Sequence, residues 1–443
     1  MRVAAADGYR ELGEAGWRWV RSQLREDDGP WLPESAPDDG SGPTPGAYRD
    51  SLYAGIAGLA PVLAEIAQHR PLDESEQDLA DRIVARLAAV AAVRTEPSLY
   101  GGLAGDATGL RLLAPGREAV ALDRLFALMT PAGWPNPLDT GPGRGVAVTD
   151  IIGGTAGIVL TAVCAGGEHA EAMATIGGEA LLRGADRTGA GLNWGMVPED
   201  SSRMPNYSHG TAGVATALAV AGTALGRSVF VDAAVLGAKH LVEVGSLEDG
   251  GFIVPHTIPP ARREVEPVTY TWCHGPAGTS HLFAALSYAG VAEMAGHGVT
   301  ELRARCLNSI LTSGVPQRLR PGFWDNDGRC CGTAGVGDVL LDAAQDSTDA
   351  ARAGMLLAAA RTMGDALAER AVRDQDGARW RFVEYRQDPP LLPPGTAWMQ
   401  GAAGIAAFLF RLARVMDDAS QAPVVDRPDE WWAVPARLRT VHG

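Results

Sequence analysis

Apolar side chains recur along this chain at the three- and four-residue spacing of helices, and one short motif precedes these runs. Examples are Leu59, Val62 and Ile66 in one run and Ile405 and Leu409 in another. The motif is Gly-x-x-Gly, and it occurs seven times, with first glycines Gly55, Gly102, Gly154, Gly210, Gly275, Gly332 and Gly401. Intervals of 47 to 69 residues between copies leave room for two helices and two loops in each repeat.

Seven further stretches with helical spacing alternate with the seven motif-led runs. They are Tyr9 to Leu24, Leu79 to Val93, Glu118 to Met129, Glu168 to Leu182, Ser228 to Val244, Glu301 to Leu311 and Ala350 to Ala371. We therefore expect an all-α fold, an α/α toroid with a double ring of seven inner and seven outer helices. The glycines would let each loop turn tightly into an inner helix.

The repeat runs across the whole chain, so we expect a single domain spanning 1–443. The toroid would occupy about 1–420, and the tail 421–443, with Trp431 and Trp432, would pack across its outside. Four long loops rich in Pro, Gly, Asp and Ser interrupt the rings, at Glu26 to Asp50, Gly133 to Gly145, Glu248 to Val268 and Asp374 to Gly395. Loops of this length are usually functional or disordered.

The overall charge argues against several classes of partner. A formal net charge of -15 disfavours binding to nucleic acid or to an anionic membrane surface. The first residues lack the apolar region of a signal peptide, and no run approaches the ~18 apolar residues of a membrane span. We therefore expect a cytoplasmic protein, in which five cysteines, two of them adjacent, are better suited to metal binding than to disulfides.

Three of the cysteines lie beside glycine in polar loops. Cys273 precedes one Gly-x-x-Gly step, and Cys330 and Cys331 precede the next. A catalytic zinc ion takes three protein ligands of this type and leaves a fourth position open. We therefore predict one Zn²⁺ per chain, held by these three residues, whereas Cys164 and Cys306 fall within helical stretches and are assigned to packing.

Other polar residues flank the same glycines. His274 is an alternative third ligand in place of Cys331, or a hydrogen-bond donor to a thiolate. His209 precedes Gly210 as Cys331 precedes Gly332, so the repeat directs it to the same end of the fold, where a histidine suits acid–base work near neutral pH. Asp150 would orient His209, donate a proton or cap a helix.

Taken together, these motifs resemble the lanthionine synthetase C-like family of zinc-dependent lanthipeptide cyclases. The resemblance covers nearly the whole chain, and its sharpest matches are Ser208-His209-Gly210-Thr211-Ala212-Gly213, Trp272-Cys273-His274-Gly275 and Cys330-Cys331-Gly332-Thr333-Ala334-Gly335. Most members have Cys-His-Gly at the last of these motifs. Some members also carry a basic residue shortly before the Trp-Cys step, where this chain has Thr269 and Tyr270.

The resemblance implies a reaction and assigns the site residues. Cys273, Cys330 and Cys331 would bind zinc, and His209 would be the acid–base residue assisted by Asp150. The enzyme would add cysteine thiols of a dehydrated precursor peptide to dehydroalanine or dehydrobutyrine, which forms (methyl)lanthionine thioether rings. Separate dehydratase or kinase/lyase enzymes would supply that peptide, and the loops from Glu248 and from Asp374 are candidates for binding its leader segment.

Three other functions fit parts of the sequence. The chain could be a zinc-stabilised scaffold that binds peptides without turnover, or an enzyme that adds a small thiol such as glutathione to dehydrated residues. Helical toroids also include glycosidases and sugar epimerases, for which Asp325, Asp327, Glu199 and Asp200 offer paired carboxylates. That third interpretation leaves the loop cysteines without a role.

Overall fold

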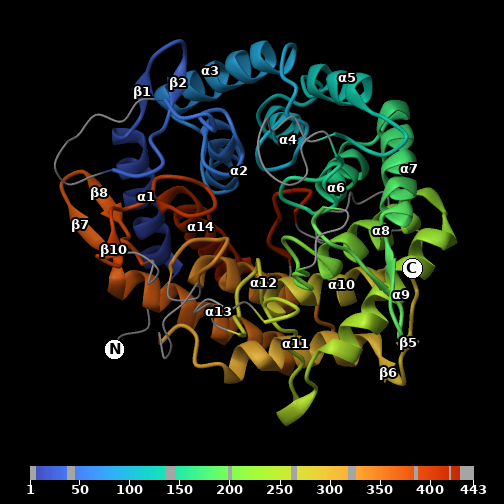
Figure 1. Cartoon of the computed structure of the whole chain (residues 1–443). Coiled ribbons are helices and arrows are strands. Elements are labelled where there is room, and N and C mark those ends of the chain that lie inside the picture. The colour runs from blue at the N-terminus through green and yellow to red at the C-terminus, as the bar shows by residue number, and fades with distance from the viewer. Residues whose placement is uncertain are drawn as a thin grey trace. The chain divides into compact units, whose positions relative to one another are not determined.

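A computed structural model describes residues 6–36, 45–135, 146–197, 202–260, 267–317, 326–383, 388–418 and 421–429. Within these residues the chain forms fourteen α-helices, two 3₁₀ turns and five short two-stranded antiparallel pairs (Figure 1). The predicted all-α class is therefore confirmed. None of the described helices is long and apolar enough to cross a membrane.

Each Gly-x-x-Gly motif leads into a helix, as its spacing predicts. Gly55 precedes a 3₁₀ turn (η1, Ile56–Gly58) that continues into α2 (Leu59–Ala67). The other motif-led helices are α4 (Leu103–Leu113), α6 (Thr155–Ala165), α8 (Thr211–Leu225), α10 (Pro276–Tyr288), α12 (Thr333–Gln345) and α14 (Ala402–Asp418). These are the predicted inner helices. They are buried on every side for most of their length, as in α8, where every residue from Thr211 to Gly222 is buried.

The alternating helices lie close to the predicted stretches. They are α1 (Ala6–Ser22), α3 (Glu74–Ala91), α5 (Ala119–Leu128), α7 (Glu168–Arg183), α9 (Ser228–Val244), α11 (Val299–Thr312) and α13 (Ala350–Arg370). Unlike the motif-led helices, they bury mainly one face, as expected for a helix with water on its other side.

Both glycines of a motif are required by close backbone approach. A Cβ atom at Gly210 would lie 1.5 Å from the carbonyl oxygen of Met204, and one at Gly213 would lie 1.9 Å from that of Tyr207. No side chain fits at such distances. The loop before α8 therefore folds back tightly against the first turn of its helix.

The five strand pairs are β1 (Arg25–Glu26) with β2 (Pro30–Trp31), β3 (Asp186–Arg187) with β4 (Leu192–Asn193), β5 (Glu293–Met294) with β6 (His297–Gly298), β7 (Val372–Asp374) with β8 (Gly377–Arg379), and β9 (Phe382–Val383) with β10 (Leu391–Leu392). Each pair is antiparallel and only two or three residues long. They are local hairpin-like contacts in the connections between helices.

Contacts between Cα atoms divide the chain into two compact units. Unit 1 comprises Met1–Leu87, Leu112–Pro115 and Ser313–Val425, and unit 2 comprises Ala88–Arg111, Gly116–Thr312 and Asp426–Gly443. The single domain expected from the repeat remains a prediction.

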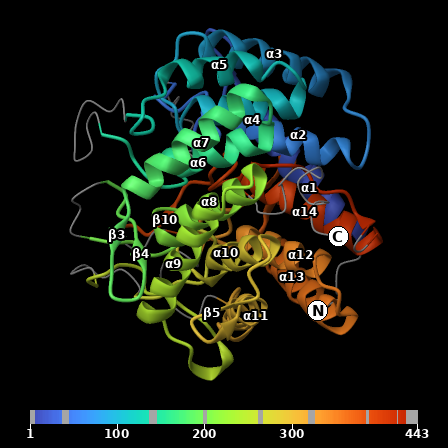
Figure 2. The ribbon, with the colours of Figure 1, turned by 90° about the vertical axis from the view of Figure 1, so that its right-hand side faces the viewer.

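Within unit 2, the motif-led helices α6, α8 and α10 pack against one another in order, and each packs against the helix that follows it, α7, α9 and α11 (Figure 2). Within unit 1, α12 packs on α13, and α14 packs on α1, α2 and α12. The repeats that begin with α6, α8, α10 and α12 are thus helical hairpins, and within each unit motif-led helices contact one another.

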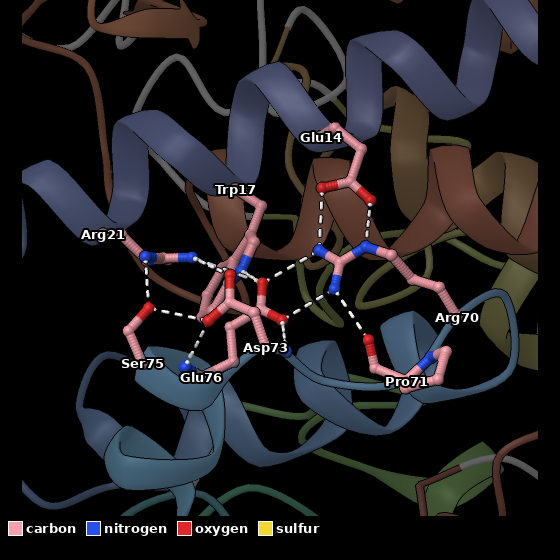
Figure 3. Close-up of polar contacts among 8 residues, drawn as sticks. All are labelled: Glu14, Trp17, Arg21, Arg70, Pro71, Asp73, Ser75 and Glu76. Carbon is pink, nitrogen blue, oxygen red and sulfur yellow. Dashed lines mark hydrogen bonds and ion pairs between the residues drawn. The ribbon is translucent and has the colours of Figure 1, made fainter.

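Unit 1 contains a network of ion pairs around the buried Glu76, between α1 and the start of α3 (Figure 3). The Glu76 side chain has 0% exposure and accepts hydrogen bonds from Trp17 Nε1 at 2.9 Å, from Arg70 Nη1 at 2.7 Å and from the backbone amide of Asp73 at 2.9 Å. Arg70 also pairs with Glu14, at 2.8 and 3.0 Å. These residues border a cavity of about 550 Å³. The network fixes α1 against the start of α3.

The tail was expected to pack across the outside. Its residues 430–443, including Trp431 and Trp432, lie outside the described part of the chain, so that expectation stays a prediction for them. The described residue Asp429 is buried, and its carboxylate accepts a hydrogen bond from Tyr100 of unit 2. This part of the tail therefore packs inside unit 2.

Candidate metal and acid–base site

Backbone hydrogen bonds join the loops that precede the inner helices of unit 2. The amide of Ser208 donates to the carbonyl of Cys273 at 3.0 Å, and the amide of Ile151 donates to the carbonyl of Ser208 at 3.2 Å. The amide of Tyr100 donates to the carbonyl of Ile152 at 3.3 Å. We call this series the loop ladder. It keeps equivalent positions of successive repeats in contact.

The same pattern occurs in unit 1. The amide of Cys330 donates to the carbonyl of Met399 at 2.9 Å, and the amide of Met399 donates to the carbonyl of Tyr53 at 3.2 Å. Tyr53, Cys330 and Met399 each lie two residues before the first glycine of their motif, as Cys273 does in unit 2. Cys273 and Cys330 thus hold the same position of the repeat.

An aspartate–histidine pair lies at the ladder of unit 2. His209 Nδ1 is 2.6 Å from Asp150 Oδ2, and the backbone amide of Gly153 donates to Asp150 Oδ1 at 2.8 Å. The Asp150 side chain is 1% exposed and that of His209 is 29% exposed. Because a carboxylate accepts, Nδ1 of His209 carries the proton and Nε2 can accept another.

Asp150 does not cap a helix. The N-cap position of α6 is Gly154, which makes no side-chain cap hydrogen bond. Instead, the hydrogen bond from Gly153 fixes the Asp150 carboxylate in the turn before α6. Of the three roles considered for Asp150, its position fits the orientation of His209 best.

A second histidine lies beside this pair. His274 is buried, and its ring centroid is 5.7 Å from that of His209 and 4.2 Å from that of His256. Burial lowers the pKa of His274 well below its usual value, and a smaller contribution comes from charge repulsion between a protonated His274 and the rings of His256 and His209. His274 is therefore neutral near pH 7. A neutral imidazole suits either a metal ligand or a hydrogen-bonding partner of a thiolate.

His256 was not predicted from the sequence. It lies in the connection between α9 and α10, where Asn206 Nδ2 donates to the carbonyls of Pro255 at 2.9 Å and of His256 at 3.3 Å. His256 lies 19 positions before Gly275, far outside the residues that directly flank the motif glycines. No periodic signal could therefore have identified His256.

The three loop cysteines are buried and reduced. In unit 1, the sulfur atoms of Cys330 and Cys331 are 3.4 Å apart, too far for the disulfide bond length of about 2.05 Å. Gln400 Nε2 donates to Cys331 Sγ at 3.6 Å. In unit 2, Thr271 Oγ1 lies 3.3 Å from Cys273 Sγ. A polar hydrogen-bonding group therefore accompanies the sulfur of Cys273 and of Cys331, as a thiolate requires.

The thiols of Cys330 and Cys331 in unit 1, and that of Cys273 in unit 2, are each of a type that can bind a metal ion. Their chemistry favours a soft or borderline cation such as zinc. The other two cysteines behave as predicted. Cys164 is buried in α6 and Cys306 in α11, and burial raises the pKa of the Cys306 thiol.

The paired carboxylates of a glycosidase are not assembled by the described residues. Asp327 is buried and forms an ion pair with Arg370, whose Nε lies 2.8 Å from Oδ1. Asp325, Glu199 and Asp200 lie outside the described residues. The one described carboxylate of that set is thus held in a structural ion pair.

The fold and these residues define a class of protein: a helical-hairpin repeat protein whose motif loops carry buried thiols and an aspartate–histidine pair. Comparison with known families places the chain more narrowly. It belongs to the lanthionine synthetase C-like protein family, whose model matches residues 46–423.

A solved structure supports the fold assignment. The structure titled "Nisin cyclase" aligns with a TM-score of 0.58 at 16% sequence identity, over 97% of this chain and 96% of that one. The predicted α/α toroid class is confirmed by this match. A second match is "Crystal structure of unsaturated glucuronyl hydrolase specific for heparin", with a TM-score of 0.48 and 10% identity over 94% of this chain and 100% of that one. A comparison with curated proteins gave no match.

Proposed function

We propose that this protein is a zinc-dependent cyclase that adds peptide cysteine thiols to dehydroalanine or dehydrobutyrine, forming (methyl)lanthionine rings. Family membership supports a lanthipeptide cyclase. The observation that carries the proposal is the set of three buried, reduced cysteines in the motif loops, together with the Asp150–His209 pair.

The cysteines have the chemistry of a zinc site. Cys330 and Cys331 of unit 1 would supply two ligands and Cys273 of unit 2 the third. The 3.4 Å between Cys330 Sγ and Cys331 Sγ is close to the edge of a zinc tetrahedron, about 3.8 Å for Zn–S bonds of about 2.3 Å. When bound, zinc would lower the pKa of a substrate thiol so that it reacts as the thiolate at neutral pH.

His209 would carry the proton through the reaction. Its Nε2 would take the proton of the substrate thiol, because Nδ1 already donates to Asp150. The sulfur then attacks the β-carbon of the dehydro residue, and His209 returns the proton to the α-carbon. One C–S bond and one C–H bond form while the carbon–carbon double bond becomes single, so the addition needs no oxidant or reductant.

Asp150 and His274 would support this cycle in different ways. Asp150 would hold the imidazole of His209 and stabilise its protonated form. His274, neutral at pH 7, would stay outside the proton transfer and remain an alternative ligand or a hydrogen-bonding partner of the thiolates. His256 packs on His274 and would fix the orientation of its ring.

The proposed substrate is a precursor peptide already dehydrated by separate dehydratase or kinase/lyase enzymes, and the proposed location is the cytoplasm. The loops predicted to bind the leader segment are Glu248 to Val268 and Asp374 to Gly395, of which 261–266 and 384–387 lie outside the described residues. The first of these loops contains His256, and the amide of Ile258 donates to the carbonyl of Arg203 at 2.8 Å. A peptide bound there would lie beside the histidines of unit 2.

Metal analysis of purified protein tests the ligand set. We expect one zinc ion per wild-type chain and substantial loss in Cys273→Ala, Cys330→Ala and Cys331→Ala. Cys164→Ala is the matched control, since it removes a buried thiol inside α6, and it should keep full occupancy. Retention of full zinc by all three loop variants would refute the assignment.

Activity is tested separately with a dehydrated cysteine-containing peptide. Cyclisation leaves the peptide mass unchanged, so ring formation is followed by the loss of alkylatable thiols. Tight peptide binding with zinc but no thiol loss would instead support a scaffold, and a mass gain with added glutathione would support small-thiol addition.

A further inference from the structure

The start of the C-terminal tail is tied to the motif loops of unit 2. The Asp429 side chain is 3% exposed, and its Oδ2 accepts a hydrogen bond from the hydroxyl of Tyr100 at 3.0 Å. The backbone carbonyl of the same residue accepts a hydrogen bond from the hydroxyl of Tyr207 at 3.2 Å. One tail residue thereby connects two loops that are more than one hundred positions apart in the chain.

These two tyrosines hold a tryptophan between them. The ring of Trp272 packs edge-on against Tyr207, with centroids 5.3 Å apart at 73°, and against Tyr100, with centroids 5.9 Å apart at 71°. Trp272 directly precedes Cys273, and Tyr207 lies two residues before His209. All three aromatic side chains are buried. The position of this aromatic cluster therefore sets the backbone that carries a proposed metal ligand and the proposed acid–base residue.

The tail itself is held in place by charge. Arg427 Nε lies 3.4 Å from Asp429 Oδ1, and both residues are buried. Arg111 of α4 reaches the tail as well, with Nη2 3.7 Å from Asp426 Oδ2. A buried carboxylate that is paired and hydrogen-bonded has one favourable position, which makes it a suitable anchor for the tyrosines.

We propose that Asp429 is a positioning residue for the proposed reaction: through Tyr100, Tyr207 and Trp272 it fixes the loops of Cys273 and His209. The inference rests on the proposed function, because it gives those two residues their roles. Mutation of residues that orient metal ligands typically reduces metal affinity or activity about 10- to 100-fold.

The test uses the full-length protein and three variants. Tyr100→Phe removes only the hydroxyl and keeps the ring packing, and Asp429→Asn removes the charge. Tyr9→Phe is the matched control, because Tyr9 is a buried tyrosine of unit 1 that donates to Asp365 Oδ1 at 2.5 Å. It loses a comparable hydrogen bond without touching Trp272.

Three measurements separate positioning from general stability. Amide hydrogen exchange should speed up at Ser208 and Ile151, the ladder amides, in Tyr100→Phe and Asp429→Asn but not in Tyr9→Phe. Zinc affinity, measured by competition with a chelator, should fall about 10-fold or more in the first two variants. The absorption bands of the cobalt(II)-substituted protein should change in the same two variants, and kcat should fall more than KM changes.

The outcomes distinguish the two proposals. Unchanged ladder exchange and unchanged metal affinity in both Tyr100→Phe and Asp429→Asn would overturn the positioning role even if the wild type is an active cyclase. If ladder exchange is faster in Tyr100→Phe and Asp429→Asn, but the wild type neither binds zinc nor cyclises peptide, the structural connection is supported and the proposed function is refuted. If Tyr9→Phe lost as much metal affinity as Tyr100→Phe and Asp429→Asn, the positioning role would also be overturned, because the loss would then result from lower stability alone.

Discussion

Replacement of Glu76 by Gln should destabilise the protein in a way that depends on pH. The change keeps the size of the side chain but removes the charge that accepts hydrogen bonds from Trp17, Arg70 and the Asp73 amide. Breaking a buried ion pair costs about 3–5 kcal/mol. The side chain of Arg70 is 33% exposed and can be partly solvated when unpaired. We therefore expect Glu76→Gln to lower the free energy of unfolding by about 3 kcal/mol at pH 7, the lower end of that range.

The pH dependence follows from the pKa values. Burial alone would raise the pKa of Glu76, but hydrogen bonds from Arg70, the Asp73 amide and Trp17 outweigh burial and lower it below 4.5. Hydrogen bonds from Ser75 and from the Glu76 amide lower the pKa of Asp73 to about 2. A carboxylate with a lowered pKa in the folded state stabilises the protein above its ordinary pKa, and this contribution is lost as pH falls through the folded value. Wild type should therefore lose stability between about pH 4.5 and pH 2.

Urea denaturation at several pH values is the assay, with Glu14→Gln as the matched control. Glu14 also pairs with Arg70, but its side chain is 32% exposed, and exposed pairs contribute about 0–1 kcal/mol. The difference between wild type and Glu76→Gln should be largest at pH 7 and should shrink toward pH 2. The reasoning would be refuted if Glu76→Gln lost as little unfolding free energy as Glu14→Gln. It would also be refuted if the loss for Glu76→Gln did not depend on pH.

Three further predictions concern the site and the repeat. Asp150→Asn should lower kcat about 10²- to 10⁴-fold with zinc content and KM little changed, measured by thiol loss from the peptide; an unchanged kcat would exclude an orienting role. Cys331→His should close rings more slowly at equal metal occupancy, because three thiolates make the substrate sulfur more electron-rich than two thiolates and an imidazole; faster closure would contradict this. Gly213→Ala should destabilise the fold by more than about 3 kcal/mol, because the new Cβ would lie 1.9 Å from the Tyr207 carbonyl oxygen. Gly354→Ala is the control, since no atom lies within 4 Å of a Cβ at that position, and urea denaturation should show it to be neutral or stabilising.

The sequence predicted the helices well because the repeat and the helical spacing agree. Ser228 to Val244 was predicted and observed with the same bounds, and each motif glycine precedes its helix as expected. The strand pairs were not predicted, since segments of two or three residues have no periodicity to detect. Asp150 and His209 were selected because they lie shortly before motif glycines, and their side chains are within hydrogen-bonding distance.

Two features of the site depend on tertiary contacts that no local pattern encodes. His256 reaches His274 from a position far from the motif glycines, and Asp429 reaches Tyr100 from the tail. The roles proposed for the site residues remain predictions, because they concern chemistry with a metal ion and a substrate.

The loop ladder has a consequence for how such proteins diverge. Its hydrogen bonds join residues counted backward from each motif glycine, so the ladder is independent of how many residues separate one glycine from the next. Those separations already range from 47 to 69 residues in this chain. Insertions can therefore accumulate in the outer connections and can change which peptides are bound. The loop ladder that contains Ser208 and Cys273 keeps its register throughout.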